Sequence, residues 1–298
     1  MNIGLALGGG SSRGWSHIGV INALAEQGIT PNIICGTSIG ALVGASHVFN
    51  NLHSLEEWVR SLTRFETARF FDISASFNGF VDTDKLHHFL NNYVASDTAV
   101  IESAEKQFAA VATELETGRE VWFTKGSVLE AVWSSISLPG LFPAIKNKNK
   151  WLIDGGLVNP VPVSVCRALG ADIVIAVNLN GNIVGKHFHQ SVTELQKNPG
   201  IIDKISDLVA EYTIPIFSDK KSEQKPPNLF EAIAGAINIT QDRITRSRMA
   251  GDPPDIMLSP KLSHIGLLEF YRASESIEEG RMCVQRMLPE IHRVFDMA

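Results

Sequence analysis

The pentapeptide Gly36-Thr37-Ser38-Ile39-Gly40 separates two apolar segments, Asn32 to Cys35 and Ile39 to Phe49. The first segment has the length of a buried strand and the second has the length of a helix. A sharp turn between a strand and a helix pushes the Ser38 side chain out of the edge of a sheet, and the two glycines leave room for close approach of the backbone. This setting favours a nucleophilic serine, although a serine that caps a helix after an ordinary tight turn would show the same pattern.

The same alternation extends in both directions from this pentapeptide. Ile3 to Leu7 is a short apolar run that predicts a strand, and Trp15 to Gln27 has the apolar spacing of a helix, which Gly28 ends. Asp172 to Leu179 is a strongly apolar segment, typical of a strand inside a parallel sheet. Strands that alternate with helices indicate an α/β fold with a central, mostly parallel sheet covered by helices.

The remaining segments complete the predicted order of elements. Phe108 to Thr113 and Glu120 to Phe123 predict a hairpin that turns near Glu116-Thr117-Gly118. Further strands are predicted at Trp151 to Ile153 and Asp255 to Leu258, and further helices at Leu55 to Phe65, Lys85 to Tyr93, Val128 to Ser137, Val161 to Leu169, Leu229 to Met249 and Leu267 to Val294.

A polar segment interrupts this order between residues 180 and 228. Its composition predicts a surface insertion or flap, with one short helix near Ile202 to Tyr212. Residues 229–298 return to helical and strand patterns. We therefore predict a single domain over residues 1–298, in which the insertion lies on the surface and residues 229–298 complete the fold.

A second glycine-rich turn, Gly8-Gly9-Gly10-Ser11-Ser12-Arg13-Gly14, follows the first predicted strand and precedes a helix. A Walker loop would require Lys after the last glycine, where Trp15 stands. A dinucleotide-binding fingerprint would require Gly in place of Arg13 and an acidic residue at the end of the second strand, where the sequence is Gly36-Thr37. Neither kind of nucleotide site fits, so we predict that consecutive backbone N–H groups form an oxyanion hole beside Ser38.

A base for Ser38 is predicted at Asp154, which ends a short strand and is followed by two glycines. An Asp-Gly pair is also common in ordinary turns, and an α/β-hydrolase triad would place a His later in the chain. The later histidines, none of which follows a strand in a glycine-rich turn, are His187, His189, His264 and His292. The sequence therefore favours a dyad in which Asp154 itself accepts the Ser38 proton, and a triad with a late His stays the alternative.

Composition limits the class of partner. The 298 residues include 26 Lys and Arg against 32 Asp and Glu, a net charge of −6, and the basic group Arg243, Arg246 and Arg248 fits the last turn of a helix. We therefore expect no nucleic-acid partner. The three cysteines have neither metal-ligand nor disulfide spacing, so we expect a reducing compartment. We expect no cofactor. With no basic leader and no apolar run of about 20 residues, the expected location is cytoplasmic. Peripheral contact with a membrane stays open, and the sequence predicts no oligomeric state.

In order and separation, these motifs resemble the patatin-like phospholipase family, in particular its short, stand-alone bacterial members. The resemblance rests on Gly8 to Gly14, Gly36 to Gly40 and Asp154-Gly155-Gly156, and it includes the stretches Gly14 to Val20 and Ser137 to Pro143. It runs from residue 3 to about residue 180 and continues more weakly from Met249 to Ile256. One departure is Ser11, which stands where the family usually has glycine. The Cβ atom of serine narrows the backbone conformations open to this position.

The resemblance implies a three-layer α/β/α fold and a lipid acyl-ester hydrolase, of the phospholipase A or lysophospholipase type, that uses no metal. It implies Ser38 as the nucleophile and Asp154 as the base, with no His in the chemistry. Backbone N–H groups of Gly9, Gly10, Ser11 and Arg13 would then form the oxyanion hole. Two other functions stay open: a soluble thioesterase or short-chain esterase with the same dyad, and a regulatory protein that acts by binding.

Overall fold

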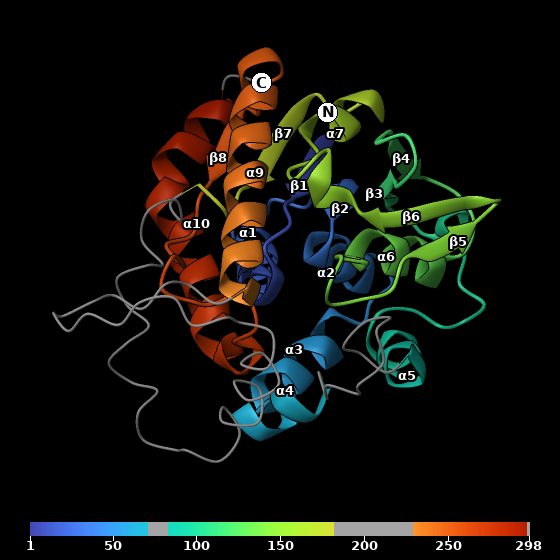
Figure 1. The fold of residues 1–298 in the computed structure, drawn as a ribbon. Coiled ribbons are helices and arrows are strands. Elements are labelled where there is room, and N and C mark those ends of the chain that lie inside the picture. The colour runs from blue at the N-terminus through green and yellow to red at the C-terminus, as the bar shows by residue number, and fades with distance from the viewer. Residues whose placement is uncertain (71–82, 182–228, 297–298) are drawn as a thin grey trace, which may run out of the picture.

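The computed structural model describes residues 1–70, 83–181 and 229–296. In these residues, one eight-stranded sheet has the order β5-β6-β3-β2-β1-β7-β8, and β4 pairs separately with β3 (Figure 1). The strands are β1 (Ile3–Leu7), β2 (Ile33–Thr37), β3 (Gln107–Glu114), β4 (Glu120–Phe123), β5 (Ile145–Asn147), β6 (Lys150–Asp154), β7 (Ile173–Val177) and β8 (Ile256–Leu258). Pairing is parallel among β3, β2, β1, β7 and β8, and antiparallel where β4, β5 and β6 join.

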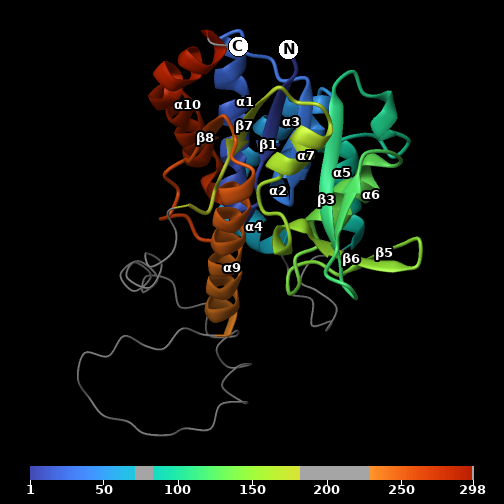
Figure 2. The ribbon, with the colours of Figure 1, turned by 90° about the horizontal axis from the view of Figure 1, so that it is seen from above.

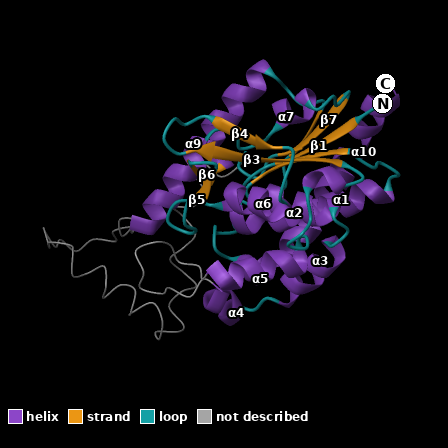
Figure 3. Cartoon of the chain, turned by 90° about the vertical axis from the view of Figure 1, so that its right-hand side faces the viewer, coloured by secondary structure: helices purple, strands orange, loops and turns teal. Residues whose placement is uncertain are grey.

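Helices cover both faces of this sheet, and Figure 3 shows α1, α2 and α6 on one face and α7 on the other. The helices are α1 (Ser16–Glu26), α2 (Ile39–Val48), α3 (Leu52–Ser61), α4 (Arg64–Phe70), α5 (Thr83–Tyr93), α6 (Val128–Ile136), α7 (Val163–Ala168), α9 (Leu229–Gly251) and α10 (Ala273–Asp296). Figure 2, seen from above, shows α9 on the opposite side of the molecule from α1 and α3.

The core lies in two layers because successive strand residues point to opposite faces of the sheet. Leu7 and Ile34 belong to the larger cluster, which includes side chains of α1, α2, α6 and α10. Ala6 and Cys35 belong to the smaller cluster, which includes side chains of α7. The chain therefore has the predicted three-layer α/β/α fold with a mixed, mostly parallel sheet.

Several predicted elements differ in their boundaries. The predicted helix Leu55 to Phe65 is two helices, α3 and α4, and the closing helix begins at Ala273 rather than at Leu267. The short strand Ile145–Asn147 was not predicted, whereas the hairpin of β3 and β4 is confirmed. The helix predicted near Ile202 to Tyr212, and nearly all of the polar segment 180–228, lie outside the described residues.

Close packing of α2 on the sheet depends on Gly40. A Cβ atom at this position would lie 2.1 Å from the carbonyl oxygen of Leu7, which belongs to a buried strand. We expect Gly40→Ala to lower the free energy of unfolding by about 3 kcal/mol, because neither backbone can move without disturbing the core. Urea denaturation measures this loss. The control Gly251→Ala meets no atom within 4 Å, and its expected change is within about 0.5 kcal/mol; equal stability of the two variants would contradict the packing argument.

Candidate active site

The register of the sheet brings Ser38 and Asp154 together. Thr37 at the end of β2 pairs with Val111 of β3, and the next residue of β3, Ala112, pairs with Asp154 at the end of β6. Ser38 Oγ donates a hydrogen bond of 2.5 Å to Asp154 Oδ2. Two residues that are 116 positions apart thus make the direct contact that a dyad requires.

Ser38 occupies a strained turn between β2 and α2. Its φ of 55° and ψ of −126° lie outside the regions that residues with a side chain usually adopt. The Ser38 N–H donates to Ser135 Oγ at 2.9 Å, and the Ser135 hydroxyl donates to the carbonyl of Val111 at 2.6 Å. Ser135, on α6, therefore links the strained residue to β3. No local pattern in the sequence indicates this role, because Ser135 lies inside a predicted helix with two other serines, Ser134 and Ser137, close to it.

Asp154 is buried, with 1% of its surface exposed. Burial raises its pKa to about 6, while hydrogen bonds from Ser38 and from the Gly156 N–H act in the opposite direction. The Gly156 N–H reaches Oδ1 at 2.7 Å, which leaves Oδ2 for Ser38. Because this pKa is below 7, the carboxylate is ionised at neutral pH and can accept a proton.

The glycine-rich turn places its predicted donors in different environments. The Gly9 N–H donates to the carbonyl of Pro160 at 2.9 Å. Gly10 and Ser11 line the pocket that contains Ser38, and their N–H groups have no hydrogen-bond acceptor among the described residues. Ser11 has φ of 53°, a conformation that favours glycine, and its Oγ donates to the carbonyl of Leu267 at 2.6 Å. The departure at Ser11 is thus accommodated with a glycine-like backbone.

Arg13 lies behind this turn rather than in the pocket. It belongs to the short 3-10 helix η1 (Ser11–Trp15) and is fully buried. Its Nε donates to the carbonyl of Gly10 at 3.1 Å, and its Nη2 donates to Asn238 Oδ1 at 3.0 Å. Burial lowers the pKa of the guanidinium to about 9, so it is still cationic at neutral pH. In the described part of the chain it forms no ion pair with a carboxylate.

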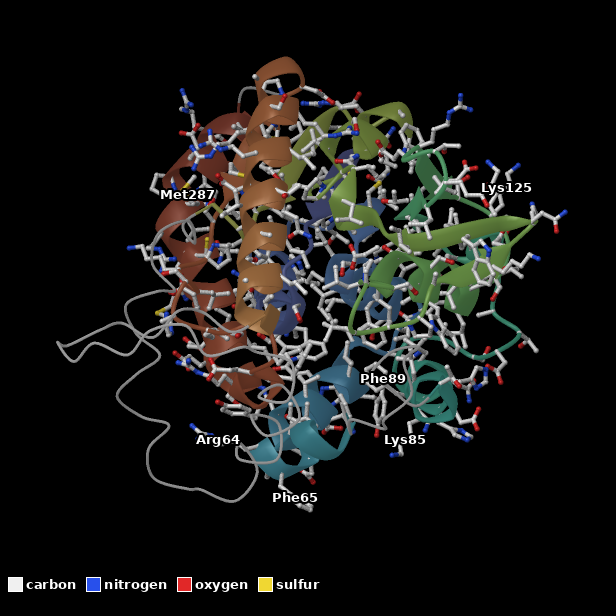
Figure 4. All side chains as sticks on the ribbon, viewed as in Figure 1. Arg64, Phe65, Lys85, Phe89, Lys125 and Met287 are labelled. Carbon is white, nitrogen blue, oxygen red and sulfur yellow. The ribbon has the colours of Figure 1, made fainter. Side chains whose placement is uncertain are left out.

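An open pocket, whose volume is about 850 Å³ when the solvent at its mouth is included, contains Ser38 and Asp154. Most of its other lining is apolar and includes Ile39, Leu42, Trp58, Leu86, Phe89 and Phe142. Phe89 on α5 is buried in this lining, whereas Phe65 on α4 points to the outside of the molecule (Figure 4). The combination of an apolar wall and one nucleophile fits a substrate with an aliphatic chain next to its reacting group.

No histidine of the described segments lines this pocket. His17 is buried behind the glycine-rich turn, where its Nε2 lies 2.8 Å from the Gly8 carbonyl and burial lowers its pKa to about 4. His264 pairs with Glu275 near the surface, while His187 and His189 lie outside the described residues. The same segments contain no cluster of three or more His, Cys, Asp or Glu suited to a metal ion.

Comparison with known proteins agrees with these features. The family model of patatin-like phospholipases matches residues 5–167, which include Ser38, Asp154 and the glycine-rich turn. An uncharacterized NTE family protein of Mycobacterium tuberculosis is 31% identical over 96% of this chain and 91% of its own length. Lysophospholipase NTE1 of Pyricularia oryzae is 28% identical over 94% of this chain, which matches only 18% of that longer protein.

A solved structure, VipD from Legionella pneumophila, aligns with 98% of this chain and 76% of its own at 12% identity, with a TM-score of 0.34 that is too low to support an argument. Within the described ranges, no helix has the length and apolarity needed to cross a membrane. The family match covers more than half of the chain and the mycobacterial relative aligns over nearly all of it. This chain belongs to the patatin-like phospholipase family.

Proposed function

We propose that this protein is a serine hydrolase that cleaves carboxylic ester bonds of lipids, of the phospholipase A or lysophospholipase type. The observation that supports it most strongly is the 2.5 Å hydrogen bond from Ser38 Oγ to Asp154 Oδ2 at an apolar pocket. Ser38 is the nucleophile in this proposal, and Asp154 is the base. The relative named as a lysophospholipase supports a lipid substrate.

The proposed reaction has two steps. Asp154 takes the Ser38 proton as Ser38 Oγ attacks the ester carbonyl carbon, and the protonated Asp154 then gives that proton to the departing alcohol. An acyl-enzyme is left on Ser38. A water molecule, deprotonated by Asp154, attacks this acyl carbon, and Ser38 recovers its proton as the fatty acid leaves. The dyad therefore returns to its starting state without a His.

The negative oxygen that forms in each step needs donors that are already in place. The backbone N–H groups of Gly10 and Ser11 are the best candidates, because both residues line the pocket and neither N–H has a hydrogen-bond acceptor among the described residues. The N-terminus of α2, which begins directly after Ser38, adds a favourable dipole. Gly9 contributes through the shape of the turn, since its N–H already binds Pro160, and Arg13 contributes as a buried cation behind the turn.

Activity should depend on pH through Asp154. Its pKa is raised to about 6, and only the ionised carboxylate accepts the Ser38 proton. We expect kcat/KM to fall about tenfold per pH unit well below pH 6 and to level off above about pH 7. Release of fatty acid from a lysophospholipid between pH 4 and pH 9 measures the profile. An activity that stays constant down to pH 4.5 would contradict the role of Asp154 as base.

The substrate class is tested by a panel of lysophospholipid, diacyl phospholipid and acyl thioester. We expect turnover of at least one of the two phospholipids, and the ratio between them assigns the type. Turnover of the thioester alone would replace the proposal with a thioesterase that uses the same dyad. If the folded protein cleaves none of these substrates, and the Ser38→Ala variant replaces the wild type fully in cells, the protein acts by binding instead.

A further inference from the structure

Helix α9 buries a polar face. Asn238, Gln241, Asp242 and Thr245 are spaced as neighbours along one side of a helix, and each is at most 5% exposed. Ile239, on another side of α9, is 45% exposed. Helices of globular proteins usually bury apolar residues at this spacing, so the reversed pattern requires polar partners inside the protein. We call these four residues the α9 polar face.

Two residues of the α9 polar face connect to the glycine-rich turn, each through one intermediate side chain. Asn238 Oδ1 accepts a hydrogen bond from Arg13 Nη2 at 3.0 Å, and Arg13 Nε donates to the carbonyl of Gly10 at 3.1 Å. Gln241 Oε1 accepts from Asn180 Nδ2 at 2.9 Å, and the same amide donates to the carbonyl of Gly9 at 3.2 Å. Both carbonyls are thus held from the side of α9.

Holding these two carbonyls fixes the two N–H groups proposed for the oxyanion hole. The carbonyl of Gly9 and the N–H of Gly10 belong to one planar peptide unit, in which they point in opposite directions. The carbonyl of Gly10 and the N–H of Ser11 form the next unit. Glycine allows such units to rotate at little cost, so a glycine-rich turn needs outside contacts to keep one orientation.

We propose that Asn238 and Gln241 are positioning residues, which act through Arg13 and Asn180 to keep the Gly10 and Ser11 N–H groups directed into the pocket. Gln241 also lies against the turn that carries the base, because a Cβ atom at Gly156 would be 2.4 Å from Gln241 Nε2. One helix therefore sets both the donors and the turn after Asp154. This inference rests on the proposed function, since it assigns these residues to the same site.

The decisive comparison is between Asn238→Leu and Asn238→Asp. The two replacements have similar size, but only aspartate keeps an oxygen that accepts a hydrogen bond from Arg13. Gln241→Leu similarly removes the acceptor for Asn180. The matched control is Thr240→Ala, at an exposed position of the same helix. Circular dichroism and thermal melting establish that each variant is folded at the assay temperature.

We expect Asn238→Leu and Gln241→Leu each to lower kcat for a p-nitrophenyl ester about 10- to 100-fold with little change in KM, because complete loss of one oxyanion donor lowers the rate about 100- to 1000-fold. Asn238→Asp and Thr240→Ala should keep most of the wild-type kcat. The inference is overturned if Asn238→Asp is as slow as Asn238→Leu, if both leucine variants are folded and fully active, or if KM changes instead of kcat.

Amide hydrogen exchange of the peptide that covers Gly8 to Gly14 separates this inference from the proposed function. We expect faster exchange in Asn238→Leu and Gln241→Leu than in the wild type and Thr240→Ala, because the turn has lost its outside contacts. Unchanged exchange in both leucine variants overturns the inference, whether or not the protein hydrolyses esters. If exchange is faster in the two leucine variants and the wild-type protein hydrolyses no ester, the inference about the contacts is supported and the proposed function alone is overturned.

Discussion

The substitution Asp154→Asn is expected to lower kcat for a carboxylic ester by on the order of 10,000-fold, the loss found when the Asp of a serine protease triad is replaced by Asn. Asparagine has the same shape, and its Oδ1 can still accept from the Gly156 N–H. Its amide nitrogen then faces Ser38 Oγ as a donor and cannot take a proton. The measurement is steady-state hydrolysis of a p-nitrophenyl acyl ester at pH 8.

Stability gives this prediction an internal control. The pKa of Asp154 is raised in the folded protein to about 6 from an ordinary value of 3.8, so the ionised form is destabilising above pH 6 and that effect disappears below about pH 4. Asp154→Asn should therefore raise the free energy of unfolding at pH 8, by up to about 3 kcal/mol, and change it little at pH 4. A variant that is inactive and less stable at pH 8 would point to misfolding rather than to loss of the base.

The substitution Ser38→Ala is expected to remove turnover almost completely, by on the order of 10⁴-fold or more, because it removes the hydroxyl proposed to carry the acyl group. The fold should persist, since the Ser38 N–H keeps its bond to Ser135 and only the bond from Oγ to Asp154 is lost. Turnover by the same ester assay measures the effect.

Ser46→Ala is the matched control for this second prediction. Ser46 is a buried serine on α2, the helix that follows Ser38, and its hydroxyl donates to the carbonyl of Tyr93 away from the pocket. Ser46→Ala removes a serine hydroxyl, as Ser38→Ala does, but outside the pocket, so activity close to that of the wild type is expected. Substantial turnover in Ser38→Ala would defeat the assignment of the nucleophile.

The parts of the site that could be predicted are those in which a strand runs directly into a turn. Ser38 directly follows β2 and Asp154 ends β6, each beside glycines, so both turns could be proposed from the sequence. Their meeting could not be derived from parallel packing, because β6 is antiparallel to β3 while β2 is parallel to it, and the two strands reach the adjacent β3 residues Val111 and Ala112 from opposite ends. Asn180 comes directly after the predicted strand Asp172 to Leu179, so it also stands in a turn at the end of a strand and could have been considered on that ground. Its role depended on a partner 61 residues later, which no local pattern indicates.

The parts that could not be predicted depend on tertiary contacts. Asn238 and Gln241 look like the polar side of a surface helix, and only the structure shows that this side is buried. The break between α3 and α4, in contrast, had a local signal. Thr63 Oγ1 accepts from the Glu66 N–H and Glu66 Oε2 accepts from the Thr63 N–H, the capping box that Thr-x-x-Glu predicts at the start of a helix.

The most direct test of the account is to label the protein with a fluorophosphonate probe and to map the modified residue by mass spectrometry. The account predicts one adduct, on Ser38, which is absent in Ser38→Ala and forms far more slowly in Asp154→Asn. Efficient labelling of another residue, or no labelling of a folded wild-type protein, would contradict it.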